Sequence, residues 1–385
     1  MFNKNIDNLT FEDVEWLIDN KVTEDQRLEY KREVWGNSEA NKKEMLKDIV
    51  SMANRYGGYI IIGLDEGDNN EAVSFSNVPN AEARKDEILS SLFANTQPRL
   101  QSIKIKILAK ENVTIMAISI PNSFRKPHMI TFSGINQFWI RHDRQKMPMS
   151  IDEIQGSIIN TSNTTKDIQS SFVIQKRIIE LQSNNQPSLA IGVSPLPRDN
   201  EIIDILDTNL RDLLSNGSTE REGGVSFNFS RALAKPSYNG LTIGSNDFRK
   251  LDLHRDGYIQ AISKLYLNED VIPPIMYGWA ILELIFSFTQ KLKHIYNHIG
   301  YDGSICVFLS LYNITNFGLY PYKDGAIGNR SHNLTRWDKD SLEINDLVFT
   351  EIDENKITKI IGDRIWQSFG FDIAPYFDNE VFLLK

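Results

Sequence analysis

The sequence of 385 residues is poor in cysteine and lacks long apolar runs. The single cysteine, Cys306, excludes an internal disulfide and a cysteine-rich zinc site, and it favours a reducing compartment. The longest apolar stretch, Ile275 to Phe288, is too short to span a bilayer and contains Glu283, so it predicts a buried helix. No apolar run follows a basic flank near Met1, so we expect no signal peptide, no membrane partner and a cytoplasmic location.

Several catalytic motifs are also missing. There is no Gly-x₄-Gly-Lys-Ser/Thr phosphate loop, which argues against nucleoside-triphosphate hydrolysis, and no Gly-x-Ser-x-Gly elbow for acyl transfer. His294 and His298 have the spacing of a zinc-protease helix, but Ile295 stands where the catalytic glutamate would be. These absences leave phosphodiester chemistry and binding functions open.

Charge is distributed unevenly along the chain. Hydrophobic residues make up 41% and charged residues 24%, as in a soluble globular protein, and the net charge is -9. The segment from Arg99 to Lys146 has nine Lys or Arg against two acidic residues, a net charge of +7, which leaves -16 for the rest. Such a segment fits a phosphate backbone, because the local potential decides that contact. The alternative is a set of solvated strand faces.

Hydrophobic periodicity predicts an α+β protein with two domains, residues 1–160 and 161–385, separated by the polar segment 160–166. The first domain is expected to combine helices and strands in a mixed α/β arrangement. Its predicted helices cover residues 10–20, 38–56 and 80–96, and its predicted strands cover residues 27–34, 59–64, 101–108, 113–120 and 136–141. In the second domain we predict strands at 225–229, 241–243 and 304–311, and helices at 274–298 and 356–369.

Glu29 and Lys31 flank Tyr30, so on a strand their side chains share one face. Many metal-dependent nucleases place an acid-x-Lys pair beside the scissile phosphate, where the carboxylate binds the cation and the lysine offsets developing charge. The motif is short, however, and it is equally typical of a salt-bridged strand surface. It therefore needs support from the surrounding sequence.

The wider pattern is more specific. Glu24 and Glu29-Tyr30-Lys31 are followed by Ala53-Asn54-Arg55-Tyr56-Gly57-Gly58 at a helix end, then by an apolar strand and Gly63-Leu64-Asp65. This order resembles the AlbA_2 domain of the Schlafen family, and the resemblance continues through Ile120-Pro121, Lys126-Pro127-His128 and Phe138-Trp139-Ile140-Arg141. It covers roughly residues 10 to 158. In nucleolytic Schlafens, two glutamates and an aspartate form a metal-dependent site that cleaves structured RNA such as tRNA.

The resemblance implies a divalent-metal-dependent endoribonuclease that acts on tRNA-like or other structured nucleic acid, with RNA favoured over DNA. Glu24, Glu29 and Asp65 would bind Mg²⁺ or Mn²⁺, and Lys31 would assist at the phosphate. The nucleic-acid backbone would be held by basic side chains of the positive segment: Arg99, Lys104, Lys106, Arg125, Lys126, His128, Arg141, Arg144 and Lys146. Alternatives are a non-catalytic nucleic-acid-binding regulator of transcription and an ATP-binding module.

Only one AlbA_2 copy is recognisable, whereas animal Schlafens have two lobes that form a clamp. A homodimer could supply the second wall of the groove, which is a hypothesis that light scattering tests. By analogy with the family, the second domain would act as a sensor or regulator of the nuclease, as in anti-phage defence.

Overall fold

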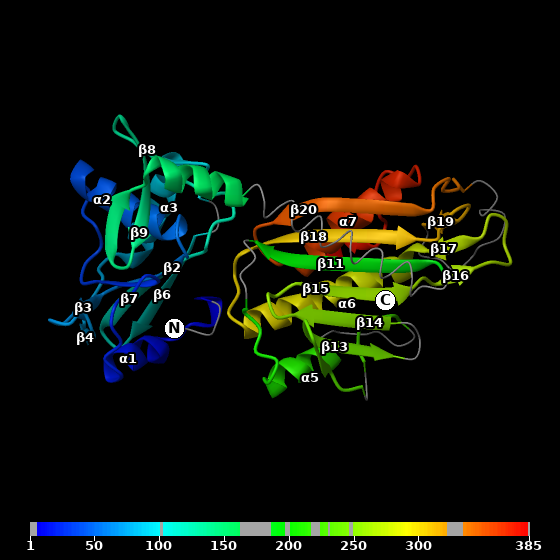
Figure 1. Ribbon diagram of the computed structural model, residues 1–385, viewed down its shortest axis with the longest axis horizontal. Helices are drawn as coiled ribbons and strands as arrows, with labels where there is room; N and C mark the ends of the chain where they lie inside the picture. Colours follow the sequence, from blue (N-terminus) through cyan, green and yellow to red (C-terminus); the bar gives the residue numbers. More distant parts are fainter. Residues whose placement is uncertain are drawn as a thin grey trace. The chain divides into compact units, whose positions relative to one another are not determined.

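The computed structural model describes residues 6–100, 103–161, 186–196, 201–216, 224–229, 232–245, 249–321 and 334–383. The chain divides into two compact units, residues 1–166 with 300–304, and residues 167–299 with 305–385. Both units combine helices with mainly antiparallel sheets (Figure 1), which confirms the α+β class. Of the polar segment predicted as a domain boundary, residues 160 and 161 end a helix over 151–161, and residues 162–166 lie outside the described residues.

The N-terminal unit is built on a four-stranded sheet in the order β1-β2-β7-β6. β1 and β2 run parallel, and the other neighbours are antiparallel. The strands are β1 (Leu28–Lys31), β2 (Gly58–Ile62), β6 (Lys104–Lys110) and β7 (Val113–Ile120). All four correspond to predicted strands, although residues 101 and 102 lie outside the described residues. β1 is an edge strand, so its side chains are accessible to elements packed beside the sheet.

Three helices cover this sheet: α1 (Phe11–Asp19), α2 (Glu39–Ala53) and α3 (Ala81–Ala94). α1 begins with a capping box, in which the Thr10 N–H donates to Asp13 at 2.8 Å. Successive residues of β2 face opposite sides, so Ile60 and Ile62 join the core that includes α2 and α3, whereas Ile61 packs with α1. The sheet is therefore buried on both faces.

Shorter strands complete the unit. β3 (Leu64–Glu66) and β4 (Ala72–Phe75) form a hairpin. A second four-stranded sheet has the order β10-β9-β8-β5, formed by β5 (Thr96–Gln97), β8 (Met129–Phe132), β9 (Ile135–His142) and β10 (Gln145–Pro148). β9 and β10 contact α2, so they bring the end of the positive segment to the α2 side of the first sheet.

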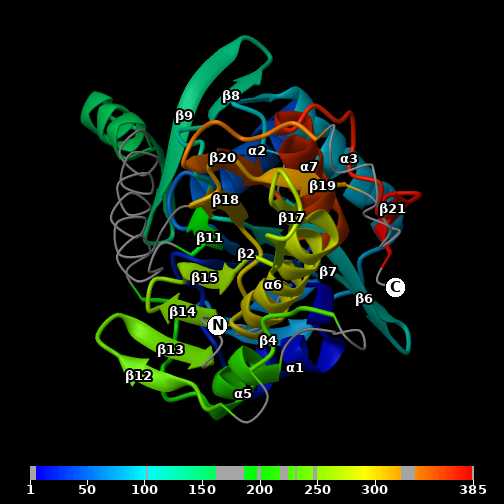
Figure 2. The ribbon, with the colours of Figure 1, turned by 90° about the vertical axis from the view of Figure 1, so that its right-hand side faces the viewer.

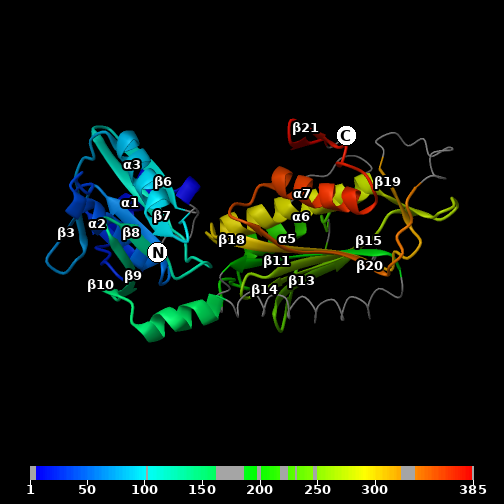
Figure 3. The ribbon, with the colours of Figure 1, turned by 90° about the horizontal axis from the view of Figure 1, so that it is seen from above.

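The second unit has a seven-stranded sheet in the order β12-β13-β14-β15-β11-β18-β20, which can be followed in Figure 2. Its strands are β11 (Ser188–Leu196), β12 (Lys235–Ser237), β13 (Gly240–Ser245), β14 (Arg249–His254), β15 (Ile259–Lys264), β18 (Ser304–Tyr312) and β20 (Ser341–Phe349). Figure 3 shows α5 (Thr208–Asn216), α6 (Gly278–His298) and α7 (Glu354–Ser368) on one face of this sheet. The unit also contains short strands outside this sheet: β16 (Leu267–Asn268), β17 (Ile275–Tyr277), β19 (Gly318–Tyr320), β21 (Phe377–Asp378) and β22 (Val381–Phe382).

Residues 278–288 of the long apolar stretch lie at the start of α6 and, except for Trp279, are buried, as predicted, whereas its first three residues form β17. None of the helices in the described part of the chain combines the length and apolar character needed to cross a membrane. The predicted strand at 225–229 is wrong. This segment is extended but pairs with a helix instead of a strand: the Val225 N–H donates to Glu283 at 3.0 Å and the Phe227 N–H to Ser287 at 2.7 Å, both on α6.

Candidate functional site

Glu29 and Lys31 lie on edge strand β1 and face α2. In the parallel pairing, Glu29 is opposite Ile60 and Lys31 is opposite Ile62, and both isoleucines belong to the core under α2. Side chains in register on parallel strands share a face. The prediction that these two side chains point the same way is therefore confirmed.

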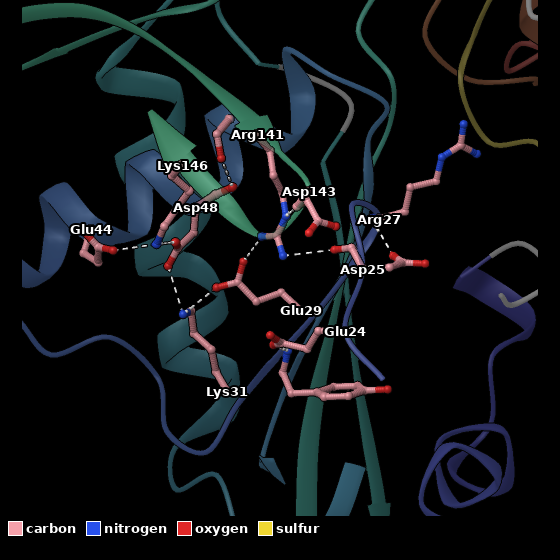
Figure 4. A network of polar contacts seen from close by, with 12 residues as sticks. Glu24, Asp25, Arg27, Glu29, Lys31, Glu44, Asp48, Arg141, Asp143 and Lys146 are labelled. Atoms are coloured by element: carbon pink, nitrogen blue, oxygen red, sulfur yellow. Dashed lines mark hydrogen bonds and ion pairs between the residues drawn. The ribbon is translucent and has the colours of Figure 1, made fainter. Parts of the chain in front are cut away.

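Asp48 of α2 lies at the centre of a polar network with these side chains (Figure 4). Lys31 Nζ is 2.7 Å from Glu29 Oε1 and 3.1 Å from Asp48 Oδ2. Asp48 is fully buried, and it also accepts a hydrogen bond from Trp35 Nε1 at 2.8 Å. Asp48 was not among the predicted site residues, although its position on the apolar face of α2 was a signal, because a carboxylate there needs a partner.

Two residues from the end of the positive segment complete the network (Figure 4). Lys146 Nζ contacts Glu44 Oε1 at 2.5 Å and also donates to Asp48. Arg141, which is only 1% exposed, forms an ion pair with Glu29 and donates to the carbonyl oxygen of Asp25 at 3.1 Å. Glu29 and Asp48 thus each contact two cationic side chains.

The network keeps its central ion pair charged. Burial would raise the pKa of Glu29, but the positive charges of Lys31 and Arg141 outweigh burial and lower it. Burial opposes the charged form of Lys31 as well, yet Asp48 and Glu29 raise its pKa. Glu29 therefore remains ionised near neutral pH, as a metal ligand requires.

Glu24 lies close to this network but has a different environment. Its Oε1 accepts a hydrogen bond from the Tyr30 N–H at 2.6 Å. Burial raises the pKa of Glu24, and the negative charges of Glu29 and Glu66 raise it further. The negative charge of Glu29 thus acts on Glu24, and no cationic side chain of the described residues forms an ion pair with Glu24, whereas two do with Glu29.

Asp65 is engaged elsewhere. It lies on β3 and accepts hydrogen bonds from Ser74 at 2.9 Å and Ser76 at 3.2 Å, and Arg32 Nε is 3.5 Å from its carboxylate. Within the described residues, no three His, Cys, Asp or Glu side chains form a group that could hold a metal ion. The expected grouping of Glu24, Glu29 and Asp65 is therefore not formed in this structure.

Two predicted nucleic-acid contacts need correction, because their side chains are buried. Arg141 is bound within the network, and His128 is only 1% exposed. The ring nitrogens of His128 lie 2.6 Å from Ser123 Oγ and 2.6 Å from the Pro98 carbonyl oxygen, and burial lowers the pKa of the ring. Neither side chain lies on a surface that a phosphate backbone could contact.

The other basic residues of the segment fall into two groups. Lys146 is held by carboxylates, Lys104 pairs with Asp7 at 2.9 Å, and Lys106 donates to the Asp7 carbonyl oxygen at 2.6 Å. The second group consists of side chains that form neither an ion pair nor a hydrogen bond with the described residues: Arg99, Arg125 and Arg144. Lys126 donates to the Arg55 carbonyl oxygen at 3.1 Å and to Asn122 at 2.9 Å. Only part of the positive segment is available to a ligand.

The donor set has the right chemistry for a hard divalent cation. Mg²⁺ usually takes one or two protein carboxylates and completes its shell with water and substrate phosphate, so Glu24 and Glu29 would suffice. Both oxygens of Glu29, however, already contact Lys31 and Arg141. The residues fit a cation on condition that one of these contacts opens.

The comparisons with known proteins agree with the motif. Residues 24–150 match the family model described as Schlafen, AlbA_2. No curated protein matches the chain. Among solved structures, one similar domain is the N-terminal domain of a protein related to the ATP-dependent DNA helicase RecG from Nitrosomonas europaea, with 20% identity and a TM-score of 0.26, covering 33% of this chain and 85% of that domain.

The DIP2311 protein from Corynebacterium diphtheriae is 13% identical with a TM-score of 0.23, and the match covers 32% of this chain and 22% of that protein. This chain thus spans about a fifth of the length of that protein. The range matched by the family model contains the whole network from Glu24 to Lys146, and the N-terminal unit of this chain therefore carries a Schlafen AlbA_2 domain.

Proposed function

We propose that the Schlafen AlbA_2 domain binds nucleic acid and cleaves RNA with the help of a divalent cation. The observation that carries this proposal is the proximity of Glu24, Glu29 and Lys31 at edge strand β1 of the first sheet. Glu24 and Glu29 would hold Mg²⁺ or Mn²⁺, which would supply Lewis-acid stabilisation of the phosphoryl oxygens. Lys31 would place a positive charge next to Glu29 and the phosphate. Asp65 as a third ligand remains a prediction.

In this proposal, the ion pair between Arg141 and Glu29 stabilises the site before a cation binds. It neutralises Glu29 while no cation is bound, which avoids leaving a buried carboxylate unpaired. Opening the pair frees one oxygen of Glu29, and the guanidinium keeps its hydrogen bond to the Asp25 carbonyl oxygen. Cation binding would then require only a local side-chain change.

The test is cleavage of total tRNA by purified protein with Mg²⁺ or Mn²⁺, compared with Glu24→Gln and Glu29→Gln variants. We expect metal-dependent cleavage by the wild type, loss in EDTA, and at least a 100-fold loss in both variants, since each removes a charged ligand. Glu82→Gln is the matched control, because Glu82 is exposed on α3 and makes the same charge change. Asp65→Asn reports whether Asp65 takes part. Single-stranded DNA in a parallel reaction tests the preference for RNA.

One observation favours a second candidate, a non-catalytic nucleic-acid-binding regulator. Glu29 is already neutralised by two basic side chains, which is typical of a structural ion-pair network. Intact RNA, with gel retention that weakens with salt and is equal in the wild type and the Glu29→Gln variant, would favour this candidate. The homodimer and a regulatory second unit remain predictions, the first of which light scattering can test.

A further inference from the structure

Three segments of the N-terminal unit meet at Gly57 and Gly58, just after α2. A Cβ on Gly57 would lie 2.3 Å from the Ile120 carbonyl oxygen, and a Cβ on Gly58 would lie 2.1 Å from the Arg27 carbonyl oxygen. Both glycines also have positive φ angles, +67° and +143°. The glycine pair therefore lets the turn at Arg27 and the segment after Ile120 approach the end of α2 closely.

At this junction one aromatic ring contacts two guanidinium groups. Arg27 Cζ lies 5.3 Å and Arg55 Cζ 4.6 Å from the centre of the Tyr56 ring. The ring is 39% exposed, and Arg27 is exposed as well. Cation–π contacts of this kind hold the planes of the guanidinium groups without using their N–H donors. The donors remain available for a ligand.

The positive charges at this junction are not compensated. Among residues 6–161 that the structure describes, neither Arg27 nor Arg55 forms an ion pair, and Nε of Arg55 is buried without a hydrogen-bond partner. Two nearby cations without a counter-charge are unfavourable. An anion bound between the two guanidinium groups would supply that counter-charge.

A further cation comes from the segment after Ile120. Lys126 Nζ donates to the carbonyl oxygen of Arg55, which places this ammonium next to the same turn. Arg125 is exposed, and its Cζ lies 5.4 Å from the centre of the Phe124 ring. Lys126 thus adds a third basic side chain at this turn, and the exposed Arg125 precedes it in the sequence.

We propose that Arg27 and Arg55, ordered by the Tyr56 ring, bind a backbone phosphate of nucleic acid together with Lys126. Arginine forks match phosphate oxygens in a bidentate manner, and such contacts position a strand without reading its sequence. The turn at Arg27 also joins this site to the network, because Asp25 accepts from both the Arg27 N–H and Arg141. This inference rests on the proposed nucleic-acid function and assigns it a binding surface.

The experiment measures binding of a fluorescent 12-nucleotide RNA by anisotropy, in EDTA, at several salt concentrations. For the Arg27→Gln/Arg55→Gln variant we expect about 10-fold weaker binding and a salt slope smaller by about 0.7, since the two arginines share one phosphate and each single-strand phosphate contact contributes about 0.7. Arg27→Lys/Arg55→Lys keeps the charge and should keep most of the slope. Arg364→Gln, an exposed arginine on α7, is the matched control and should bind like the wild type.

A second measurement needs no variant. Phenylglyoxal modification of the wild type, read by mass spectrometry, should show Arg27 and Arg55 protected by the RNA and Arg364 unprotected. Unchanged salt slope in the double Gln variant, or equal modification with and without RNA, would overturn the proposal. So would competition by ATP at concentrations that match the RNA affinity, because it would assign the site to free nucleotides.

These outcomes are independent of catalysis. Binding in EDTA that depends on Arg27 and Arg55, without any cleavage in Mn²⁺, supports the phosphate site and contradicts the nuclease. Cleavage that needs Glu29 but is unaffected in the double Gln variant, with unchanged binding, supports the nuclease and contradicts the phosphate site.

Discussion

Asp48 makes hydrogen bonds to three side chains that come from different parts of the N-terminal unit. Trp35 precedes α2, Lys31 comes from β1 and Lys146 from β10. The carboxylate is fully buried, so its desolvation cost must be offset by these partners. Removing one member of a buried ion pair costs more than the pair contributes, because the remaining charges lose their counter-ion.

The first prediction follows from this arrangement. Asp48→Ala should lower the free energy of unfolding by about 3 kcal/mol, because Lys31, Lys146 and the Trp35 N–H lose their common acceptor. Urea unfolding followed by tryptophan fluorescence measures this change. Glu44→Ala is the control: its side chain is 45% exposed, so we expect a loss below about 1 kcal/mol. Equal losses in both variants would contradict the central role of Asp48.

For single residues, the sequence predicted the direction in which a side chain points better than it predicted which residue the side chain contacts. Alternation on a strand was enough to place Glu29 and Lys31 on one face. The contact between Glu29 and Arg141 joins residues 112 positions apart, and no local pattern reports it. Arg141 was therefore assigned to a phosphate surface on the basis of its charge alone, whereas the fold buries it against a carboxylate.

Among the helices, α6 combines an apolar surface with a polar stripe at four-residue spacing, Glu283, Ser287 and Lys291. Glu283 and Ser287 accept hydrogen bonds from the extended segment 224–229. Lys291 Nζ donates to the carbonyl oxygens of Leu213 at 3.0 Å and Leu214 at 2.7 Å, in the last turn of α5. A lysine there satisfies carbonyl groups that have no partner within the helix.

The second prediction concerns pH. Burial lowers the pKa of Lys291 from 10.5 to about 7. Between these values the unfolded chain binds a proton that the folded chain does not, so the free energy of unfolding rises with pH, by up to about 1.4 kcal/mol per unit. Below pH 7 the lysine is charged in both states and the full burial cost remains; above 10.5 it is neutral in both and the cost is gone.

Lys291→Met should therefore remove this contribution, and the dependence of stability on pH between 7 and 9.5 should become flatter than in the wild type. Urea unfolding at four pH values within this range measures it. Lys293→Met is the matched control, since Lys293 is 40% exposed and pairs with Glu354, and its slope should stay like that of the wild type. A Lys291→Met slope equal to that of the wild type would contradict the lowered pKa.

Elements with clear periodicity were predictable, and α1, α2, α6 and α7 begin within a few residues of their expected starts. The segment 225–229 has the composition of a strand, but its N–H groups bond to side chains of α6, a long-range partner that composition cannot reveal. β11, in contrast, is a strand that was not predicted, because its composition is not typical of a strand. Gly192 and Pro195 interrupt its pattern, yet all nine residues are buried in the centre of the sheet.

For the molecule as a whole, the +7 segment is a weaker electrostatic feature in three dimensions than along the sequence. Acidic residues from outside the segment neutralise much of it: Lys104 pairs with Asp7, Lys110 with Glu15 at 2.7 Å, and Lys146 with Glu44. The local potential at the folded surface is therefore set by the basic groups that lack such partners. Folding shifts the positive potential away from β6.

The third prediction tests this redistribution. Lys104, Lys106 and Lys110 lie on β6 and each contacts an acidic residue or its carbonyl group near the N-terminus. If all three bound phosphates, their replacement by Gln would reduce the salt slope of RNA binding by about 2, at about 0.7 per contact. Because Lys104 and Lys110 already pair with carboxylates and Lys106 already donates to a carbonyl oxygen, we expect the triple Gln variant to change the slope by less than about 0.5.

The Arg27→Gln/Arg55→Gln variant is the reference for this measurement, because it removes two charges that have no ion-pair partner among the described residues of the N-terminal unit. Both variants are titrated with the same RNA in EDTA, and thermal melting shows that each is folded. A larger slope change in the β6 variant than in the arginine variant would mean that the lysines release Asp7 and Glu15 and turn to the RNA. RNA binding would then depend on the number of basic residues in the positive segment, whether or not these residues form ion pairs in the folded chain.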